Sequence, residues 1–600
     1  MGRTEAGQGR NGVFLFRLTK PRRSKGGVFL GQAPAAERIN QGGIKEGFLG
    51  MKQWKDEVLE LTKELVHHPS VNGTIGERDI AYRIYDYFKE LKYFKENPHH
   101  LRLVKTLRDE RERYNVLALV KGGDAAYRET VILMGHMDTV GVEDFGKWKR
   151  LAFSSDELME RWKGAKIPEK VKRDLESGEW ACGRGSVDMK SGVAANMVLT
   201  RYFTEHPEEL KGNLLFLSEC DEEDNSHGIL SALSDFLHLA REEDLSYIAA
   251  INADYTSPRY EGDPNRYVYL GTVGKLLPAF FIAGKETHVG QAFEGFDPNL
   301  VASELTRRLD YNPDFCDEMY GETTLPPVSL KQTDLKLQYD VQTPLSAFVY
   351  YNFFVHSWSP KDVLEKLKKV AWDAMDSARK QYQKRYGEYC ARTGDPHQPP
   401  NWVPRVYTYE ELYNECAEKY GSEFEESMRL FAMNLLNEEE LDLRDYCRRM
   451  TEELWSWDEE KTPAVVLFYA SIYIPRIVLN EEEERDQRLI QAVERAVESI
   501  QPDCPHPIRV RNFFPYISDM SFVAISDDQE GLDSLEKNMP AWGTKHQMDV
   551  DAIRALDVPV VNIGPYGMDA HKQWERVEVP YSMEVVPNLN YQVIKNLLGA

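Results

Sequence analysis

Cysteine is scarce in this 600-residue chain, which has only seven, and no two of them form a Cys-x-x-Cys pair. An odd, scattered set in a long chain argues against a disulfide framework and against a cysteine zinc cluster. Such a set is typical of a reducing compartment, so we expect a cytoplasmic protein. Long apolar runs are missing too, since stretches such as 464–474 are too short to span a bilayer.

Positive charge is also in short supply, because 98 acidic residues outnumber 74 basic ones and give a net charge of −24. Nucleic acids and anionic membranes both bind basic surfaces, so neither is expected as a partner. Residues 1–50 differ from the rest, being rich in Gly and Arg and poor in acids, without a secretory hydrophobic segment. We expect a disordered extension there, arising from a start upstream of Met51, with an Arg-rich targeting arm as the alternative.

The remaining composition is that of a folded protein, with 42% hydrophobic and 11% aromatic residues. A chain of this length exceeds what one core can hold, so two or three domains are expected. From Met51 onward, apolar segments of strand length alternate with segments of helical period. The expected strands of this part are 114–120, 131–134, 214–217, 247–253 and 558–563. The alternation predicts an α/β fold with a mostly parallel, helix-covered sheet, whose ligands gather at the carboxyl ends of the strands.

A second domain is expected inside the first. Around Tyr267 the pattern changes, and the expected elements are strands within 267–283, 347–355 and 463–474 and helices at 298–309 and 360–378. We therefore expect residues 51–266 and 476–600 to form the sheet domain and residues 267–475 to form an inserted α+β domain. Within this insert, residues 383–461 read as a helical extension that contains the capping-box pattern Thr408-x-x-Glu411.

Polar side chains follow the expected strands. His136-x-Asp138 comes directly after the strand at 131–134, and a carboxylate beside a histidine can fix the ring tautomer of a metal ligand. This motif alone is weak, because many strand ends carry surface polar groups. The Gly-rich loop 183–192 adds Asp188 at the start of an expected helix, whose dipole favours an ionised carboxylate. The loop lacks the Gly-Lys-Ser/Thr of a phosphate-binding loop.

Three further candidates complete the polar set: the acidic triplet Asp221-Glu222-Glu223, Asp254 and His571. Acidic triplets are usually solvated, but this one follows an apolar strand directly. Two histidines and several carboxylates without a thiolate suit Zn²⁺ or another divalent transition ion better than Mg²⁺ or Ca²⁺.

These motifs occur in one order along the chain: Gly135-His136-x-Asp138, Gly183-Arg184-Gly185-x-x-Asp188-Met189-Lys190, Asp221-Glu222-Glu223, Asp254, Thr287-His288 and Ala570-His571. Their order resembles that of the M20 family of co-catalytic zinc aminoacylases, deacetylases and carboxypeptidases, over residues 51–600. The resemblance implies a zinc-peptidase catalytic domain and makes the insert a lid and dimerisation domain. The run 135–144 and the long lid are most similar to the arginine-utilisation branch of this family, which implies a link to arginine catabolism.

The resemblance implies a metal-binding role for five residues. Asp188 would bridge two divalent metal ions, expected to be Zn²⁺, with Co²⁺ or Mn²⁺ as alternatives. His136 and Asp254 would complete one metal site. Glu223 and His571 would complete the other.

The resemblance implies catalytic and substrate-binding roles as well. Glu222 would be the general base, acting on a water that the two cations make nucleophilic, and Asp138 would orient the histidine ligand beside it. His288 would cross from the lid of a partner subunit to stabilise the oxyanion, which makes a homodimer the expected state. Ser518-Asp519 resembles a Ser/Thr-Asp element near the substrate pocket.

The expected reaction is hydrolysis of an amide bond in a peptide or an N-acyl amino acid. Three departures from the family leave the substrate open: residues 224–228 are not Gly-rich, Gly141 stands where many relatives have Pro, and the lid is long. The arginine that many relatives use to hold a substrate carboxylate is not identifiable, and His227 is an additional pocket candidate. Two alternatives are a non-catalytic M20-like scaffold or binding protein and, with less support because no basic phosphate clamp is visible, a phosphohydrolase.

Overall fold

The computed structural model describes residues 51–599 except 108, 110, 125, 397, 399–401 and 439–440. The extension expected at residues 1–50 lies outside the described residues. Within the described part of the chain, no helix combines the length and the apolar character needed to cross a bilayer.

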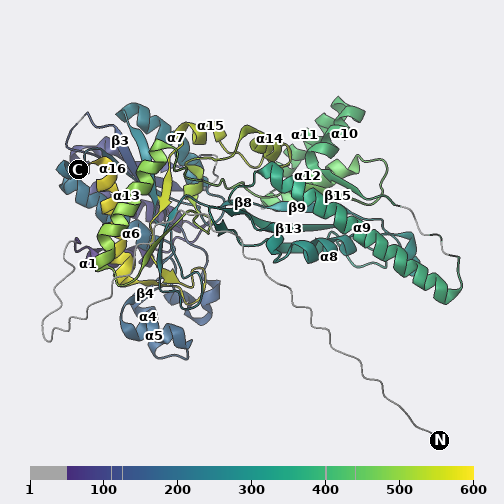
Figure 1. The fold of residues 1–600 in the computed structure, drawn as a ribbon, viewed down its shortest axis with the longest axis horizontal. Coiled ribbons are helices and arrows are strands. Elements are labelled where there is room, and N and C mark those ends of the chain that lie inside the picture. The colour runs from purple at the N-terminus through teal and green to yellow at the C-terminus, as the bar shows by residue number, and fades with distance from the viewer. Residues whose placement is uncertain are drawn as a thin grey trace, which may run out of the picture. The chain divides into compact units, whose positions relative to one another are not determined.

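An eight-stranded sheet carries the first and last parts of the described chain (Figure 1). Its strands are, in spatial order, β1 (Leu101–Lys105), β2 (Tyr114–Lys121), β5 (Asn213–Glu219), β3 (Glu129–His136), β6 (Ser246–Asn252), β17 (Val560–Asn562), β7 (Arg266–Leu270) and β16 (Ile508–Arg511). The four central strands β5, β3, β6 and β17 are parallel, whereas β1 with β2, β2 with β5, and β17 with β7 pair antiparallel. The predicted α/β class is confirmed, and the sheet is mixed because antiparallel strands flank its parallel centre.

The central strands are buried along almost their whole length. In β3 every residue from Thr130 to His136 is buried, which accounts for the unbroken apolar run 131–134. The helix α6 (Lys190–Glu205) packs on β3 and β5, and α1 (Lys55–His67) and α16 (Val586–Leu598) pack on α6. The helix α13 (Glu484–Ile500) in turn packs on α16, and Figure 1 shows these four helices together.

A six-stranded sheet holds the middle of the chain. Its strands are β12 (Val328–Asp334), β13 (Ser346–Val355), β9 (Pro278–Ala283), β15 (Ala464–Tyr469) and β14 (Arg405–Thr408), with β8 (Gly274–Leu276) beside β13. The long helices α8 (Pro298–Leu309) and α9 (Pro360–Thr393) pack against each other and against this sheet. Both lie alongside β13 in Figure 1.

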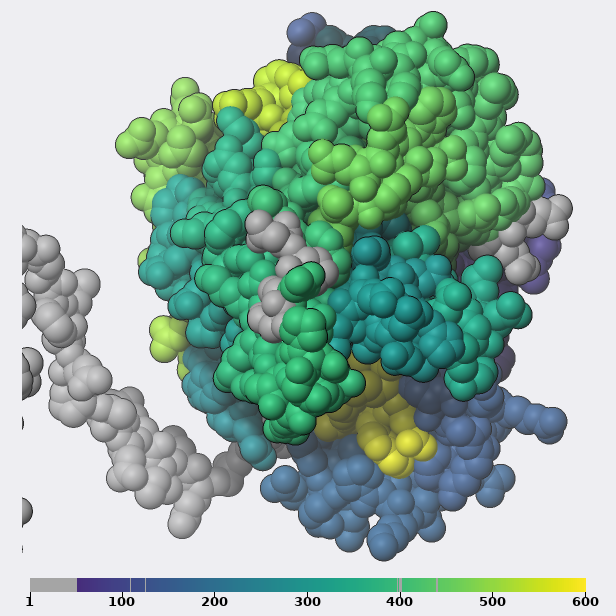
Figure 2. Space-filling view, turned by 90° about the vertical axis from the view of Figure 1, so that its right-hand side faces the viewer, coloured from purple at the N-terminus to yellow at the C-terminus, as the bar shows by residue number. Residues whose placement is uncertain are grey.

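Three shorter helices follow α9: α10 (Tyr409–Tyr420), α11 (Ser422–Leu436) and α12 (Leu443–Ser456). The predicted capping box is present, since the Thr408 hydroxyl accepts the backbone N–H of Glu411 at 3.3 Å and the Glu411 carboxylate accepts that of Thr408 at 2.8 Å. Figure 2 looks onto a face formed largely by residues of the six-stranded sheet and these helices, coloured teal to green.

Three expected boundaries differ from the observed ones. The strand β7 pairs with β16 and β17, so a domain boundary at residue 267 cuts through a strand of the large sheet. The helix expected to end at residue 378 runs on to Thr393, because no proline interrupts it and the single Gly387 costs only about 1 kcal/mol in a helix interior. It ends at the left-handed Gly394. The strand expected at 463–474 ends at Tyr469. The division into a catalytic and an inserted domain stays a prediction.

Gly192 sets the contact between α6 and the end of β6. A Cβ atom on Gly192 would lie 2.1 Å from the carbonyl oxygen of Ala253, so the helix must shift to admit it. We expect Gly192→Ala to lower the free energy of unfolding by about 1–3 kcal/mol, the usual cost of overpacking, measured by urea denaturation. The control is Gly164→Ala, where the nearest atom is the Arg161 carbonyl oxygen at 3.9 Å. Equal stability of the two variants would contradict the expectation.

Candidate active site

Three neighbouring strands end at the same place and deliver polar side chains there. His136 is the last residue of β3, Glu222 and Glu223 follow β5, and Asp254 follows β6. Since β5, β3 and β6 are adjacent and parallel, their carboxyl ends lie at one edge of the sheet. The edge therefore gathers groups that are more than a hundred residues apart in the sequence.

Asp188 lies between the two predicted histidine ligands. Its Oδ1 is 3.1 Å from Nε2 of His136, and its Oδ2 is 3.0 Å from Nε2 of His571. The same His571 nitrogen is 3.0 Å from Oε1 of Glu223. Each oxygen of one carboxylate thus faces a different imidazole, which is the arrangement that a bridging metal ligand requires.

The predicted ligands fall into two groups that share Asp188. Candidate ligand atoms of His136, Asp188 and Asp254 lie within 4.8 Å of one another, and those of Asp188, Glu223 and His571 do the same. Both groups match the sets expected from the sequence. The donors are imidazole nitrogens and carboxylate oxygens, and this chemistry fits Zn²⁺ and other divalent transition ions. Their role as ligands stays a prediction.

The charged groups in this cluster shift one another's pKa values strongly. Burial lowers the pKa of His571, but hydrogen bonds with Asp188 and Glu223 outweigh it and raise the pKa to about 11. The pKa of His136 is likewise raised well above its usual value, because the surrounding carboxylates outweigh burial. Burial raises the pKa of Asp188, yet both imidazoles lower it below its ordinary range. The cluster therefore attracts positive charge, either as protons or as cations.

Glu222 lies beside the cluster. Its Oε2 is 3.8 Å from Nε2 of His136, and its side chain is 11% exposed. Burial raises the pKa of Glu222 well above its usual value, and the nearby Glu223 adds to this effect. Glu222 also forms a candidate ligand group with His136 and Glu223, so the base and the ligand among the two glutamates are distinguished by experiment below.

Asp138 holds the acidic turn as well as the histidine. Its carboxylate oxygens accept the backbone N–H groups of Glu222 and Glu223, each at 3.2 Å. Nδ1 of His136 lies 3.2 Å from the Asp138 carbonyl oxygen and 3.6 Å from its carboxylate. The predicted orienting residue is therefore placed beside His136, and its carboxylate makes its shorter contacts with the turn.

We did not identify Asn72 and Arg113 from the sequence as residues that support the site. The Asn72 amide donates to Asp138 at 3.2 Å and to Asp221 at 2.9 Å, so it joins two carboxylates under the acidic turn. Arg113 is buried and donates to Asp221, whose other oxygen lies 2.5 Å from Nδ1 of His227. His227 thus supports the turn through Asp221. No spacing links residues 72, 113 and 221, so no sequence signal identified them together.

A buried arginine ties the Gly-rich loop to the His571 loop. Arg184 donates to the buried Glu575, to Asp144 at 2.7 Å and to the Gly141 carbonyl oxygen at 3.1 Å. Glu575 also accepts the backbone N–H of Val187 at 3.4 Å. Segments 141–144, 184–187 and 575 are held together by these contacts, which places Asp188 and His571 on one rigid support.

The segment Ser518-Asp519 lies beneath the Asp254 ligand. The Ser518 hydroxyl accepts the Asn252 amide at 2.9 Å and bonds the Asp254 carboxylate. Both Ser518 and Asp519 are buried, and burial raises the pKa of Asp519 to about 8. Ser518 thus supports Asp254, whereas the Asp519 carboxylate interacts with Ser226 and with the charge of His136. Contact with substrate stays a prediction.

His288 lies apart from the candidate ligand groups formed by the described residues. It is exposed, precedes the short helix Val289–Glu294, and its Nδ1 accepts the Gly290 N–H at 3.0 Å. Its backbone pairs with Gln342 in a loop of the middle sheet. A catalytic role for His288 would therefore need a second subunit, as the sequence resemblance implies.

We also did not identify from the sequence two cationic residues, Lys275 and Arg444, whose charges interact with the acidic segment 221–224. Lys275 on β8 is half-buried, and its ammonium has no hydrogen bond or ion pair within the described residues. Burial and the charge of Arg444 lower the pKa of Lys275, whereas Glu222 raises it. Arg444, at the start of α12, also lowers the pKa of Asp224 through its positive charge, against the larger effect of burial, which raises it. The charge of Lys275 thus interacts with Glu222, and that of Arg444 with Asp224, next to the acidic triplet.

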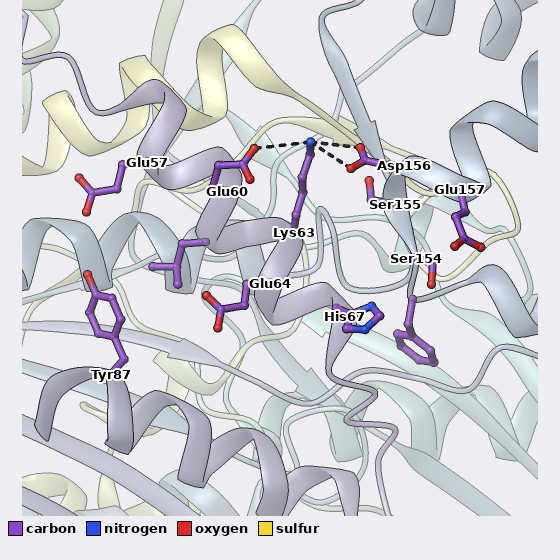
Figure 3. A pocket seen from close by; sticks show the side chains of 12 residues that line it. Glu57, Glu60, Lys63, Glu64, His67, Tyr87, Ser154, Ser155, Asp156 and Glu157 are labelled. Carbon is purple, nitrogen blue, oxygen red and sulfur yellow. Dashed lines mark hydrogen bonds and ion pairs between the residues drawn. The ribbon is translucent and has the colours of Figure 1, made fainter. Parts of the chain in front are cut away.

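A cavity of about 710 Å³ lies elsewhere, between α1 and the segment 153–157 (Figure 3). Several of its acidic groups are paired: Lys63 is 3.6 Å from Glu60 and 3.1 Å from Asp156. Among the other lining residues, Glu57 accepts Arg201 at 2.7 Å. The cavity shares no residue with the ligand groups, so the site is defined by the cluster at the strand ends.

The fold and the polar cluster define a metal-dependent hydrolase of the peptidase and amidohydrolase class. The family model for peptidase family M20/M25/M40 matches residues 132–555, and the chain belongs to this family. It is 38% identical to Protein RocB of Bacillus subtilis (strain 168), over 90% of this chain and 95% of RocB.

The chain is also similar to a second curated protein and to a solved structure. The chain is 34% identical to the uncharacterized protein YqjN of Bacillus subtilis (strain 168), over 91% of this chain and 97% of YqjN. The solved structure of Bacillus subtilis YxeP, described as a dinuclear metal-binding peptidase of the M20 family, aligns with a TM-score of 0.45 and 10% identity, covering 90% of this chain and 97% of YxeP.

Metal binding should release protons. His136 and His571 both have raised pKa values in the metal-free protein, so they are protonated at neutral pH, and a metal-bound imidazole must be neutral. The affinity for Zn²⁺ should therefore rise with pH between about pH 6 and 8, by up to tenfold per pH unit for each proton released. Calorimetry in buffers of different ionisation enthalpy measures the released protons. A pH-independent affinity with no buffer dependence would contradict the expectation.

Proposed function

We propose that this chain hydrolyses an amide bond in a peptide or an N-acyl amino acid. The observation that supports it most is the placement of one carboxylate, Asp188, between two imidazoles, with Glu222 beside them. Asp188, His136 and Asp254 would hold one divalent cation, and Asp188, Glu223 and His571 a second. When bound, such a pair lowers the pKa of a water and polarises a carbonyl group. Zn²⁺ is our first choice, with Co²⁺ or Mn²⁺ as alternatives.

Glu222 is the proposed general acid and base. As a carboxylate it takes a proton from the attacking water, and as an acid it gives that proton to the leaving amine. Burial and the neighbouring Glu223 raise its pKa, which brings proton uptake and release closer to neutral pH. The hydrogen bonds from Glu222 and Glu223 N–H to Asp138 fix the turn that presents it.

The first test is Glu222→Gln, which keeps the shape of the side chain and removes its basicity. We expect kcat to fall by about 10²–10⁴, the scale of general acid–base catalysis, with metal content unchanged. The measurements are turnover of an N-acyl amino acid and elemental analysis of the purified protein.

Glu223→Gln is the matched control for that test. It should lower metal content, because Glu223 contacts His571 at 3.0 Å and belongs to a ligand group with Asp188. The reverse pattern, with metal lost in Glu222→Gln and kept in Glu223→Gln, would exchange the two roles. If both variants keep wild-type turnover, the proposed mechanism is wrong.

We infer that Lys275 and Arg444 hold an anionic group of the substrate. Lys275 has no ion-pair partner among the described side chains, and both cations act on the acidic turn that carries Glu222. Arg444 is 30% exposed, and its ion pair is with Asp442, two residues earlier on the chain. A free carboxylate on the substrate would supply the missing partner for Lys275. This inference favours N-acyl amino acids and peptides with a free carboxyl end close to the cleaved bond.

Lys275→Met tests this assignment, because it keeps the half-buried chain and removes the charge. We expect KM for an N-acyl amino acid to rise about 10-fold or more, since hydrogen bonds to charged groups contribute about 1.5–3 kcal/mol. KM for the corresponding amino acid amide, which lacks the carboxylate, should change little. An equal change of KM for both substrates would show that Lys275 does not bind the substrate carboxylate.

The link to arginine catabolism rests on the resemblance of the run 135–144 and the long lid to the arginine-utilisation branch of the family. We infer that N-acyl arginine and arginine-containing dipeptides belong in the first substrate panel. Metal-loaded protein should be assayed against them beside acyl derivatives of neutral and acidic amino acids.

A homodimer is proposed as the active state. A set of large apolar side chains is exposed on β12 and on the loop that follows it: Leu330, Leu337, Tyr339, Val341 and Leu345. The same loop pairs with His288 through Gln342. An exposed apolar edge strand is a template for pairing with a second chain. Pairing here would bring His288 toward the active site of the partner subunit, where it would stabilise the oxyanion.

Subunit complementation tests this arrangement. Glu222→Gln and His288→Ala homodimers should both be nearly inactive, but a mixed dimer contains one site with neither change if His288 acts across subunits. Random pairing of equal amounts should restore about one quarter of wild-type activity. No recovery on mixing, with subunit exchange verified by mass spectrometry, would place His288 outside the partner's site.

A further inference from the structure

A second group of potential metal ligands lies at the far end of α7 (His227–Glu243). Glu243 is the last residue of this helix, and His99 and His100 come from the short 3₁₀ helix Pro98–His100. Nε2 of His99 is 3.9 Å from Oε1 of Glu243, and Nε2 of His100 is 3.6 Å from Oε2. The helix has 17 residues, so Glu243 is about 25 Å along its axis from the acidic turn that precedes it. The group is thus separate from the active site.

The spacing of these ligand atoms suits a shared cation. Two ligand atoms bound at about 2.1 Å in tetrahedral geometry lie about 3.4 Å apart. The two imidazole–carboxylate distances are slightly longer than this and longer than a strong hydrogen bond. Candidate ligand atoms of all three residues lie within 4.8 Å of one another, as in the groups at the active site.

The other nitrogen of His100 has its own partner. His100 is buried, and its Nδ1 is 2.9 Å from the Tyr93 hydroxyl, which also accepts the backbone N–H of Lys121 at 2.8 Å. The Tyr93 oxygen can accept a hydrogen bond from Nδ1–H, which leaves Nε2 as the lone-pair nitrogen directed at Glu243. Metal-bound histidines commonly donate their second N–H in this way.

Lys121 is the competing cation in this group. Its ammonium is 3.5 Å from Oε2 of Glu243, and it donates more closely to the Glu243 carbonyl oxygen at 2.7 Å. Lys121 is therefore held mainly by the helix end, because its contact with the Glu243 carbonyl oxygen is shorter than its contact with the carboxylate. The carboxyl end of a helix also carries partial negative charge, which favours a bound cation.

We propose that His99, His100 and Glu243 bind one divalent transition ion, in addition to the two cations of the active site. The donors are two imidazoles and one carboxylate, a set that suits Zn²⁺, Ni²⁺ or Co²⁺ and leaves a coordination position for water. The ion joins the 3₁₀ helix before β1 to the end of α7. Its role is to stabilise this corner of the sheet, and the reaction does not pass through it.

The test uses the full-length protein with the active-site ligand group disabled. Asp188→Asn removes the shared ligand, so retained Zn²⁺ then reports the additional group. After exposure to micromolar Zn²⁺ and gel filtration, we expect about one retained equivalent in Asp188→Asn and almost none when His99→Gln or Glu243→Gln is added. Bound Zn²⁺ should also raise the melting temperature of Asp188→Asn, an effect that His99→Gln abolishes.

His238→Gln is the matched control. His238 is an exposed histidine on the same helix, 2.9 Å from Glu242, and it belongs to none of the candidate ligand groups that the described residues form. This control should leave Zn²⁺ retention in Asp188→Asn unchanged. In the otherwise wild-type enzyme, His99→Gln should keep turnover and lose one equivalent of metal. Retention that is equal in the His99→Gln and His238→Gln proteins, or absent from Asp188→Asn altogether, would overturn the proposal.

Discussion

The contact of one buried carboxylate with two imidazoles is the interaction on which the rest of the site depends. Asp188 is 5% exposed and faces His136 with one oxygen and His571 with the other. Charged groups taken out of water need partners, and here the partners are the predicted ligands of two cations. Because the ligands carry more negative than positive charge, the pocket attracts protons or metal ions, and the pKa values of both histidines rise.

The surrounding hydrogen bonds serve to keep these charged groups in place. Asp138 and Asn72 hold the acidic turn, and Arg184 with Glu575 joins the Gly-rich loop to the loop of His571. Asp254 is held on its backbone by Asn562, whose amide donates to the Asp254 carbonyl oxygen at 2.8 Å and whose oxygen accepts the Asp254 N–H at 3.0 Å. If the site binds two cations, it needs such supports, since a displacement of Asp188, which both ligand groups share, would weaken both metal positions.

The six-stranded sheet and the helices that follow it contribute further cationic and apolar groups. Lys275 and Arg444 direct positive charge at the acidic turn, and His288 lies beside an exposed apolar edge. The family supplies the reaction class, whereas these groups supply the features that would select a substrate and a partner. Within the helical extension, Arg444 at the start of α12 lowers the pKa of Asp224 beside the acidic triplet.

The sequence by itself determined the fold class, the helix Pro298–Leu309 to the residue, the capping box at Thr408 and the residues that meet at the strand ends. These follow from local signals, because hydrophobic period, caps and short motifs are written in neighbouring residues. Only the tertiary structure decided that β7 belongs to the large sheet, that Asn72 joins Asp138 to Asp221, and that the charge of Lys275 interacts with Glu222. Those contacts join segments distant in the chain, and their energy depends on burial and distance, which no local pattern encodes.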